Sequence, residues 1–89
     1  MIEREVEIVN RLGLHARAAA KLVHTAGGFR SQITLIMDGE EVDAKSILGI
    51  LLMAAAQGSR LTLRAEGQDE ESALAAVTSL IANRFDEGS

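Results

Sequence analysis

Hydrophobic and polar residues alternate in two segments of this chain. Residues 2–9 carry apolar side chains at positions 2, 6 and 8 and glutamates at positions 3, 5 and 7. Residues 59–66 alternate leucine and alanine with arginine and threonine. This period of two predicts strands that are buried on one face. Residues 31–37 are also rich in strand-forming types, and Asp38-Gly39 predicts a hairpin to a short strand over residues 40–42.

Three further segments have the spacing of helices. The alanine-rich residues 15–26 end before Gly27-Gly28, and Ser46 stands as an N-cap before the apolar residues 47–53. A third helix is expected to begin after Asp69. Its predicted apolar stripe consists of Leu74, Val77, Leu80, Ile81 and Phe85. We expect Asp69, Glu70 and Glu71 to cap this helix rather than to act as paired catalytic carboxylates.

The resulting order of elements is β-α-β-β-α-β-α, with each strand apolar on one face. This pattern predicts an α+β fold in which a mainly antiparallel sheet of four strands is covered on one side by helices. At 89 residues, the chain is expected to form a single domain over residues 1–89.

Composition narrows the possible functions. The chain has no cysteine, which excludes disulfides, thiolate metal sites and a cysteine nucleophile. No apolar run approaches the roughly 20 residues of a membrane span, so we expect a cytoplasmic protein. A net charge of −4 without Trp or Tyr argues against a nucleic-acid binder. The sequence also contains no metal-ligand cluster, catalytic triad or nucleotide-binding loop, so we expect no cofactor, no metal and no free-standing enzyme.

The charge is distributed unevenly. Residues 11–30 contain Arg11, Arg17, Lys21 and Arg30 but no Asp or Glu, so they carry four positive charges, and the other 69 residues carry eight net negative charges. Such a segment is either an ordinary solvated face or a docking surface for an acidic partner or a phosphate. Both histidines, His15 and His24, lie in this segment.

The first of these histidines stands at a predicted helix start, in the motif Gly13-Leu14-His15-Ala16-Arg17. Backbone N–H groups of the first turn, those of Ala16, Arg17 and Ala18, have no helical partner and favour an anion. The helix dipole also favours the neutral imidazole, which can attack phosphorus. Arg17 could bind phosphoryl oxygens, and Gly13 could let a partner approach closely. The alternative is that His15 is an ordinary surface or capping residue.

The chain resembles the histidine-containing phosphocarrier (HPr) family of the bacterial phosphotransferase system. The resemblance is carried by residues 13–17, by Ala19-Ala20-Lys21-Leu22-Val23 and by Lys45-Ser46-Ile47-Leu48-Gly49, and it covers essentially the whole chain. It implies an open-faced β-sandwich that accepts a phosphoryl group from enzyme I on Nδ1 of His15 and passes it to an enzyme IIA component. Ala18 stands where the family usually has proline.

The same resemblance implies a second site. In this family the serine at the position of Ser46 is the target of an ATP-dependent kinase, HPr kinase/phosphorylase. A phosphate there would add about −1.5 to −2 charges at the start of a helix. This role and the N-cap role of Ser46 are compatible.

The short helix after Ser46 is too apolar to bury every side. We therefore predict that Leu48, together with Ile47 and Leu51, contributes to an exposed surface for partner docking, with Arg11 and Lys21 at its rim. We interpret His24 as a surface residue, since it lies about 180° from His15 around an ideal helix. Arg30 is expected to be a solvated charge.

One alternative function comes from a different class. The chain could be a regulatory binding module of the nitrogen-related phosphotransferase branch that acts through Ser46 and the adjacent apolar surface. The Lys45-Ser46-Ile47 segment favours the carbohydrate branch, whereas the tail over residues 83–87 resembles the regulatory branch. In either case we expect a monomer with no membrane and no nucleic-acid partner.

Overall fold

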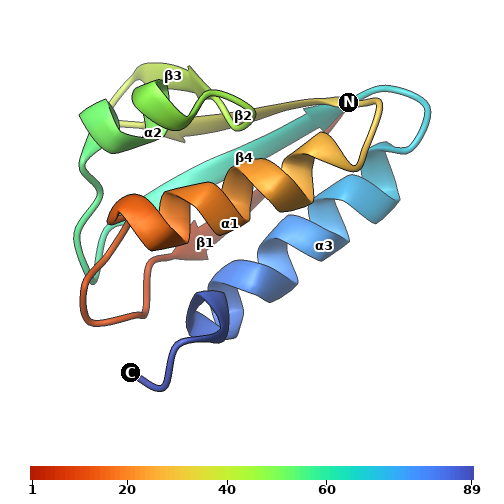
Figure 1. Ribbon diagram of the computed structural model, residues 1–89. Coiled ribbons are helices and arrows are strands. Elements are labelled where there is room, and N and C mark those ends of the chain that lie inside the picture. The colour runs from red at the N-terminus through yellow and green to blue at the C-terminus, as the bar shows by residue number, and fades with distance from the viewer.

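The computed structural model describes Met1–Ser89 and contains four strands and three helices (Figure 1). Their order is β1 (Ile2–Glu7), α1 (Ala16–Gly27), β2 (Gln32–Met37), β3 (Glu40–Asp43), α2 (Ile47–Met53), β4 (Arg60–Glu66) and α3 (Glu70–Ala82), followed by a short 3₁₀ turn, η1 (Arg84–Asp86). None of the helices has both the length and the apolar character that crossing a bilayer requires.

The strands form one sheet in the order β1-β4-β2-β3, and all three pairings are antiparallel. Helices α1 and α3 lie side by side across one face, and α2 packs beside α1 and β3 (Figure 1). The opposite face is open. There the Arg64 guanidinium bridges Glu3 on β1 and Glu41 on β3, with N···O distances of 3.0 and 3.4 Å. The predicted α+β fold is confirmed.

The core lies between the sheet and the helices and contains 20 buried apolar residues. Leu61, Leu63 and Ala65 of β4 face it, as their alternation predicts, because every second side chain of a strand points to the same face. The hairpin prediction at Asp38-Gly39 is also confirmed, since both residues have the positive φ angles, 53° and 83°, of a tight turn between strands.

The end of the last helix differs from the prediction. Helix α3 ends at Ala82, so Phe85 does not belong to its stripe. Arg84, Phe85 and Asp86 all have φ between 54° and 63°, and this left-handed turn folds the chain back. Phe85 still enters the core, where its side chain is fully buried. Burial of the ring and a 2.6 Å hydrogen bond from Lys21 Nζ to the Phe85 carbonyl hold this turn against α1.

Asp69 does not cap α3 with its side chain, which corrects a second prediction. Its carboxylate accepts hydrogen bonds from the backbone N–H groups of Arg30 and Ser31, each at 2.9 Å, and from the Ser31 hydroxyl. The Ser31 hydroxyl bond contributes most to lowering the pKa of Asp69, which falls to about 2 from 3.8. Asp69 therefore ties the segment between α1 and β2 to the start of α3.

These contacts of Asp69 predict a pH dependence of stability. Because the folded pKa lies below the unfolded value, the contribution of Asp69 is present above about pH 4 and is lost as the pH falls through about 2. Asp69→Asn should destabilise the protein at pH 6, and its difference from the natural protein should shrink between pH 4 and pH 2. Urea unfolding across this range measures the difference, and a constant difference would contradict the account.

Candidate functional site

His15 is the N-cap residue of α1, with extended backbone angles (φ −75°, ψ 177°), and its side chain does not cap the helix. The first helical hydrogen bond runs from Ala19 N–H to the His15 carbonyl at 2.8 Å. The N–H groups of Ala16, Arg17 and Ala18 therefore have no acceptor within the protein. The imidazole is attached directly beside three free donors at the positive end of a helix dipole.

The loop before His15 is fixed by a close approach of two backbone segments. Leu14 N–H donates to the Ala55 carbonyl at 2.9 Å. Gly13 has φ +67°, and a Cβ placed on it would lie only 2.5 Å from the same carbonyl oxygen. Gly13 is buried, so the close approach that it permits is to the protein's own chain and not, as predicted, to a partner.

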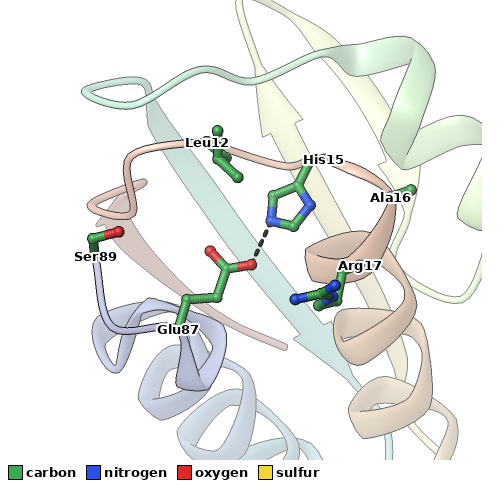
Figure 2. Close-up of a pocket in the computed structure, with 6 residues that line it drawn as sticks. All are labelled: Leu12, His15, Ala16, Arg17, Glu87 and Ser89. Carbon is green, nitrogen blue, oxygen red and sulfur yellow. Dashed lines mark hydrogen bonds and ion pairs between the residues drawn. The ribbon is translucent and has the colours of Figure 1, made fainter.

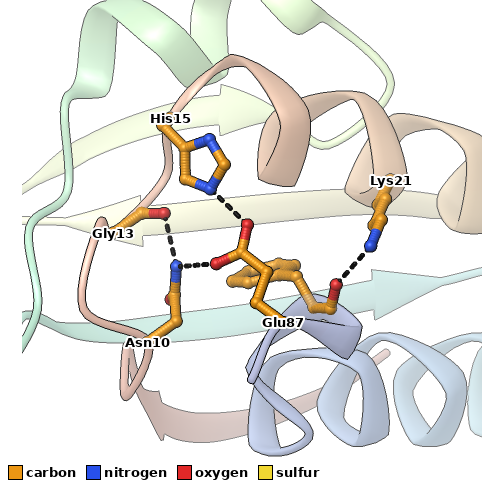
Figure 3. A network of polar contacts seen from close by, with 6 residues as sticks. Asn10, Gly13, His15, Lys21 and Glu87 are labelled. Atoms are coloured by element: carbon orange, nitrogen blue, oxygen red, sulfur yellow. Dashed lines mark hydrogen bonds and ion pairs between the residues drawn. The ribbon is translucent and has the colours of Figure 1, made fainter. Parts of the chain in front are cut away.

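A buried asparagine connects this loop to the C-terminus (Figure 3). The side chain of Asn10 is fully buried. Its Nδ2 donates to the Gly13 carbonyl at 2.8 Å and to Oε1 of Glu87 at 3.2 Å. Both acceptors need a donor, so the amide nitrogen must face them.

The second oxygen of Glu87, Oε2, contacts Nε2 of His15 (Figures 2 and 3). Partial burial raises the pKa of Glu87, but the hydrogen bonds from His15 and Asn10 outweigh it, so the pKa lies below its usual value. An ionised carboxylate can only accept hydrogen bonds. The Nε2 atom of His15 is therefore the donor in this contact.

His15 borders an open hollow of about 450 Å³ (Figure 2). The lining residues are Leu12, His15, Ala16, Arg17, Glu87 and Ser89. The side chain of His15 is one-quarter exposed (25%), whereas Arg17 is exposed and forms no hydrogen bond or ion pair within the protein. The hollow thus offers an accessible imidazole and an unpaired guanidinium to an anion.

Helix α2 presents an apolar surface to solvent. Ile50 and Met53 are buried, whereas Ile47, Leu48 and Leu51 have exposed fractions of 44%, 65% and 36%. The predicted exposure of Leu48 is confirmed. Two further exposed leucines, Leu12 and Leu52, were not predicted.

The other residues predicted from the sequence differ in their exposure and in their hydrogen bonds. Ser46 is the N-cap of α2, as predicted, and its Oγ accepts a hydrogen bond from Gly49 N–H at 3.1 Å. Lys21 is half-buried and bonded to Phe85, while Arg11 is exposed. His24 and Arg30 are exposed, as predicted, and neither lines the His15 hollow.

Comparison with known protein families shows to which family this chain belongs. Residues 2–83 match the family described as "PTS HPr component phosphorylation site". This chain belongs to the HPr family. It is 52% identical over 88 residues to the phosphocarrier protein HPr of Cupriavidus necator, covering 99% of both chains, and 43% identical over 88 residues to the phosphocarrier protein NPr of Shewanella violacea, covering 99% of this chain and 97% of the relative.

A solved structure shows the same fold. The crystal structure of HPr from Thermoanaerobacter tengcongensis superposes with a TM-score of 0.96, at 47% identity and with full coverage of both chains. The chain is therefore an HPr-type phosphocarrier of the phosphotransferase system. A phosphocarrier is not a catalytic enzyme, which confirms the expected class.

Sequence reasoning missed two residues of this HPr site, Asn10 and Glu87. Their contact joins positions 77 residues apart. Asn10 belongs to no motif, and Glu87 stands out in the sequence only as part of the tail over residues 83–87 that resembles the regulatory branch. No periodicity relates this tail to the loop before α1. The only other signal was an amide shortly after a strand, which is also typical of an ordinary turn.

The Gly13 geometry predicts a large effect for a small substitution. Gly13→Ala adds a Cβ against the Ala55 carbonyl at a φ that disfavours side chains, so we expect a loss of roughly 1–3 kcal/mol in unfolding free energy. Gly27→Ala is the matched control, because its Cβ would meet nothing within 4 Å. Equal urea midpoints for the two variants would show that the backbone approach at Gly13 is not constrained.

Proposed function

We propose that this HPr-family protein accepts a phosphoryl group from phospho-enzyme I on Nδ1 of His15 and transfers it to an enzyme IIA component. The observation that carries the proposal is the position of His15 as N-cap beside three free backbone N–H groups. These N–H groups and the unpaired guanidinium of Arg17 can donate hydrogen bonds to the transferred group and stabilise its negative charge.

The transfer itself needs only positioning and charge stabilisation. The Nδ1 lone pair forms the new N–P bond, and the bond from phosphorus to the donor breaks with its electrons remaining on the donor. The phosphoryl oxygens then receive hydrogen bonds from the N–H groups of Ala16, Arg17 and Ala18. The same contacts are weak enough, at roughly 0.3–1 kcal/mol each for exposed helix-terminus interactions, to release the group to the next partner.

Docking of both partners is supported by the exposed apolar side chains of Ile47, Leu48 and Leu51 on α2. Exposed apolar surface of this kind marks protein interaction sites. Arg11 is exposed and can add positive charge for an acidic partner surface, whereas Lys21 is half-buried and donates to the Phe85 carbonyl. The His15 hollow is open rather than enclosed, so two different proteins can reach the same nitrogen in turn.

We further propose that Ser46 is a regulatory phosphorylation site for an HPr kinase/phosphorylase. Its hydroxyl lies at the start of α2, where a phosphate is favoured by the free N–H groups and the helix dipole. A phosphate there would place a new negative charge next to Ile47 and Leu48. Repulsion of an acidic partner would then reduce docking without altering His15.

We favour the carbohydrate branch over the nitrogen-regulatory branch, because the HPr of Cupriavidus necator is more similar to this chain, at 52% identity, than the NPr of Shewanella violacea, at 43%. We propose that the protein acts as a cytoplasmic monomer without a cofactor.

The His15 proposal is tested by incubation with phosphoenolpyruvate and enzyme I. The natural protein should acquire one acid-labile phosphoryl group by mass spectrometry, and His15→Ala should acquire none. His24→Ala is the matched histidine control on the same helix and should be labelled normally. Arg17→Ala should slow labelling by roughly 100-fold, as expected for loss of one preorganised charge donor. Persistent labelling of His15→Ala would overturn the proposal.

The Ser46 proposal predicts that the charge at position 46, and not the ability of that residue to cap α2, controls docking. Ser46→Asp should weaken binding to enzyme I by roughly tenfold, equivalent to about 1.4 kcal/mol. Ser46→Asn keeps a good N-cap without charge and should bind like the natural protein. Isothermal titration of both variants measures the difference, and equal affinities would contradict a charge-based mechanism.

A further inference from the structure

We propose that Glu87 is a positioning residue for the phosphoryl acceptor: its carboxylate keeps the proton of His15 on Nε2 and so leaves the lone pair of Nδ1 free to attack phosphorus. This inference rests on the proposed function of His15 and adds to it a residue near the C-terminus. Glu87 lies beyond the residues that match the HPr family, which end at position 83.

The carboxylate of Glu87 is held through both oxygens. Oε2 contacts Nε2 of His15, and Oε1 accepts from Nδ2 of Asn10 at 3.2 Å (Figure 3). The Asn10 amide cannot turn over easily, because the same Nδ2 also donates to the Gly13 carbonyl and the side chain is fully buried. The Glu87 side chain itself is only 14% exposed.

The backbone near Glu87 is equally fixed. Glu87 N–H donates to the Arg84 carbonyl at 2.9 Å. Two residues earlier, Phe85 is fully buried and its carbonyl accepts from Lys21 Nζ at 2.6 Å. The left-handed turn over residues 84–86 thus directs the Glu87 side chain back toward the start of α1 (Figure 2).

The chemistry of the imidazole gives this contact a consequence. A neutral histidine carries one N–H donor and one bare acceptor nitrogen, and the partner of one nitrogen determines the state of the other. A carboxylate at Nε2 stabilises the tautomer with Nε2–H. The nitrogen left with a lone pair is then Nδ1, which is the atom that the proposed transfer requires.

The electron and proton balance of the transfer is consistent with this role. The Nδ1 lone pair forms the N–P bond, the donor keeps the electrons of the broken bond, and no proton leaves His15. The ring then bears a positive charge with its proton still on Nε2. The Glu87 carboxylate remains hydrogen-bonded to that proton and compensates the charge.

The direct test measures the tautomer of His15 without any partner. In ¹⁵N spectra of the full chain at pH 8, the natural protein should show Nδ1 as the unprotonated nitrogen and Nε2 as the protonated one. Glu87→Ala should shift this equilibrium toward a mixture of tautomers. Glu87→Gln retains a neutral acceptor oxygen and should lie between the two. Asp86→Asn, an exposed carboxylate on the same turn, is the matched control and should leave the spectrum unchanged.

The second readout separates positioning from binding. Single-turnover phosphorylation by phospho-enzyme I should be roughly tenfold slower for Glu87→Ala, which is the lower end of the loss found when the hydrogen-bond partner of a metal-bound histidine is removed. Its dissociation constant for enzyme I should stay unchanged. Glu87→Gln should recover part of the rate.

The two possible failures are distinguishable. If Glu87→Ala kept the natural tautomer ratio of His15 and the natural phosphorylation rate, the role of Glu87 would be overturned and the carrier function would stand. A natural protein that takes up no phosphoryl group would instead overturn the carrier function, whatever the tautomer.

Discussion

The position of His15 depends on a close contact between two backbone segments, Gly13-Leu14 and Ala55-Ala56. A hydrogen bond of 2.9 Å joins Leu14 N–H to the Ala55 carbonyl, and there is no space for a Cβ on Gly13. This contact fixes the buried loop directly before α1, which begins at Ala16 with His15 as its N-cap. It holds that loop against the chain that follows the apolar helix α2, and the free donors of the first turn of α1 follow the imidazole directly in the sequence.

A carrier must hold a phosphoryl group firmly enough to protect it and loosely enough to release it. The His15 site has features suited to both demands: three backbone donors and one guanidinium beside an open hollow, with no cluster of three or more His, Cys, Asp or Glu side chains that could hold a metal ion. Ala18 keeps its backbone N–H where the family usually has proline, so the first turn of α1 has one more free donor than in a chain with proline there. The first turn is correspondingly less rigid, because alanine does not fix φ.

Local pattern was sufficient to predict most elements of the fold. Alternation located β1 and β4 to within two residues, and the Asp38-Gly39 pair located the hairpin. His15 and Ser46 could also be placed at helix starts, because capping depends on nearby residues. The predictions failed where distant segments meet. Phe85 belongs to a left-handed turn rather than to α3, because its burial against α1 and the hydrogen bond from Lys21 outweigh the helical spacing. Asp69, Asn10 and Glu87 likewise bond to residues far away in the sequence.

The most direct test of the account is the ¹⁵N spectrum of the uniformly labelled protein after incubation with phosphoenolpyruvate and enzyme I. The account predicts a ³¹P–¹⁵N coupling on Nδ1 of His15, with large shifts of the Ala16, Arg17 and Ala18 amides that receive the phosphoryl oxygens. A coupling on Nε2, or phosphorylation without shifts of those three amides, would contradict it.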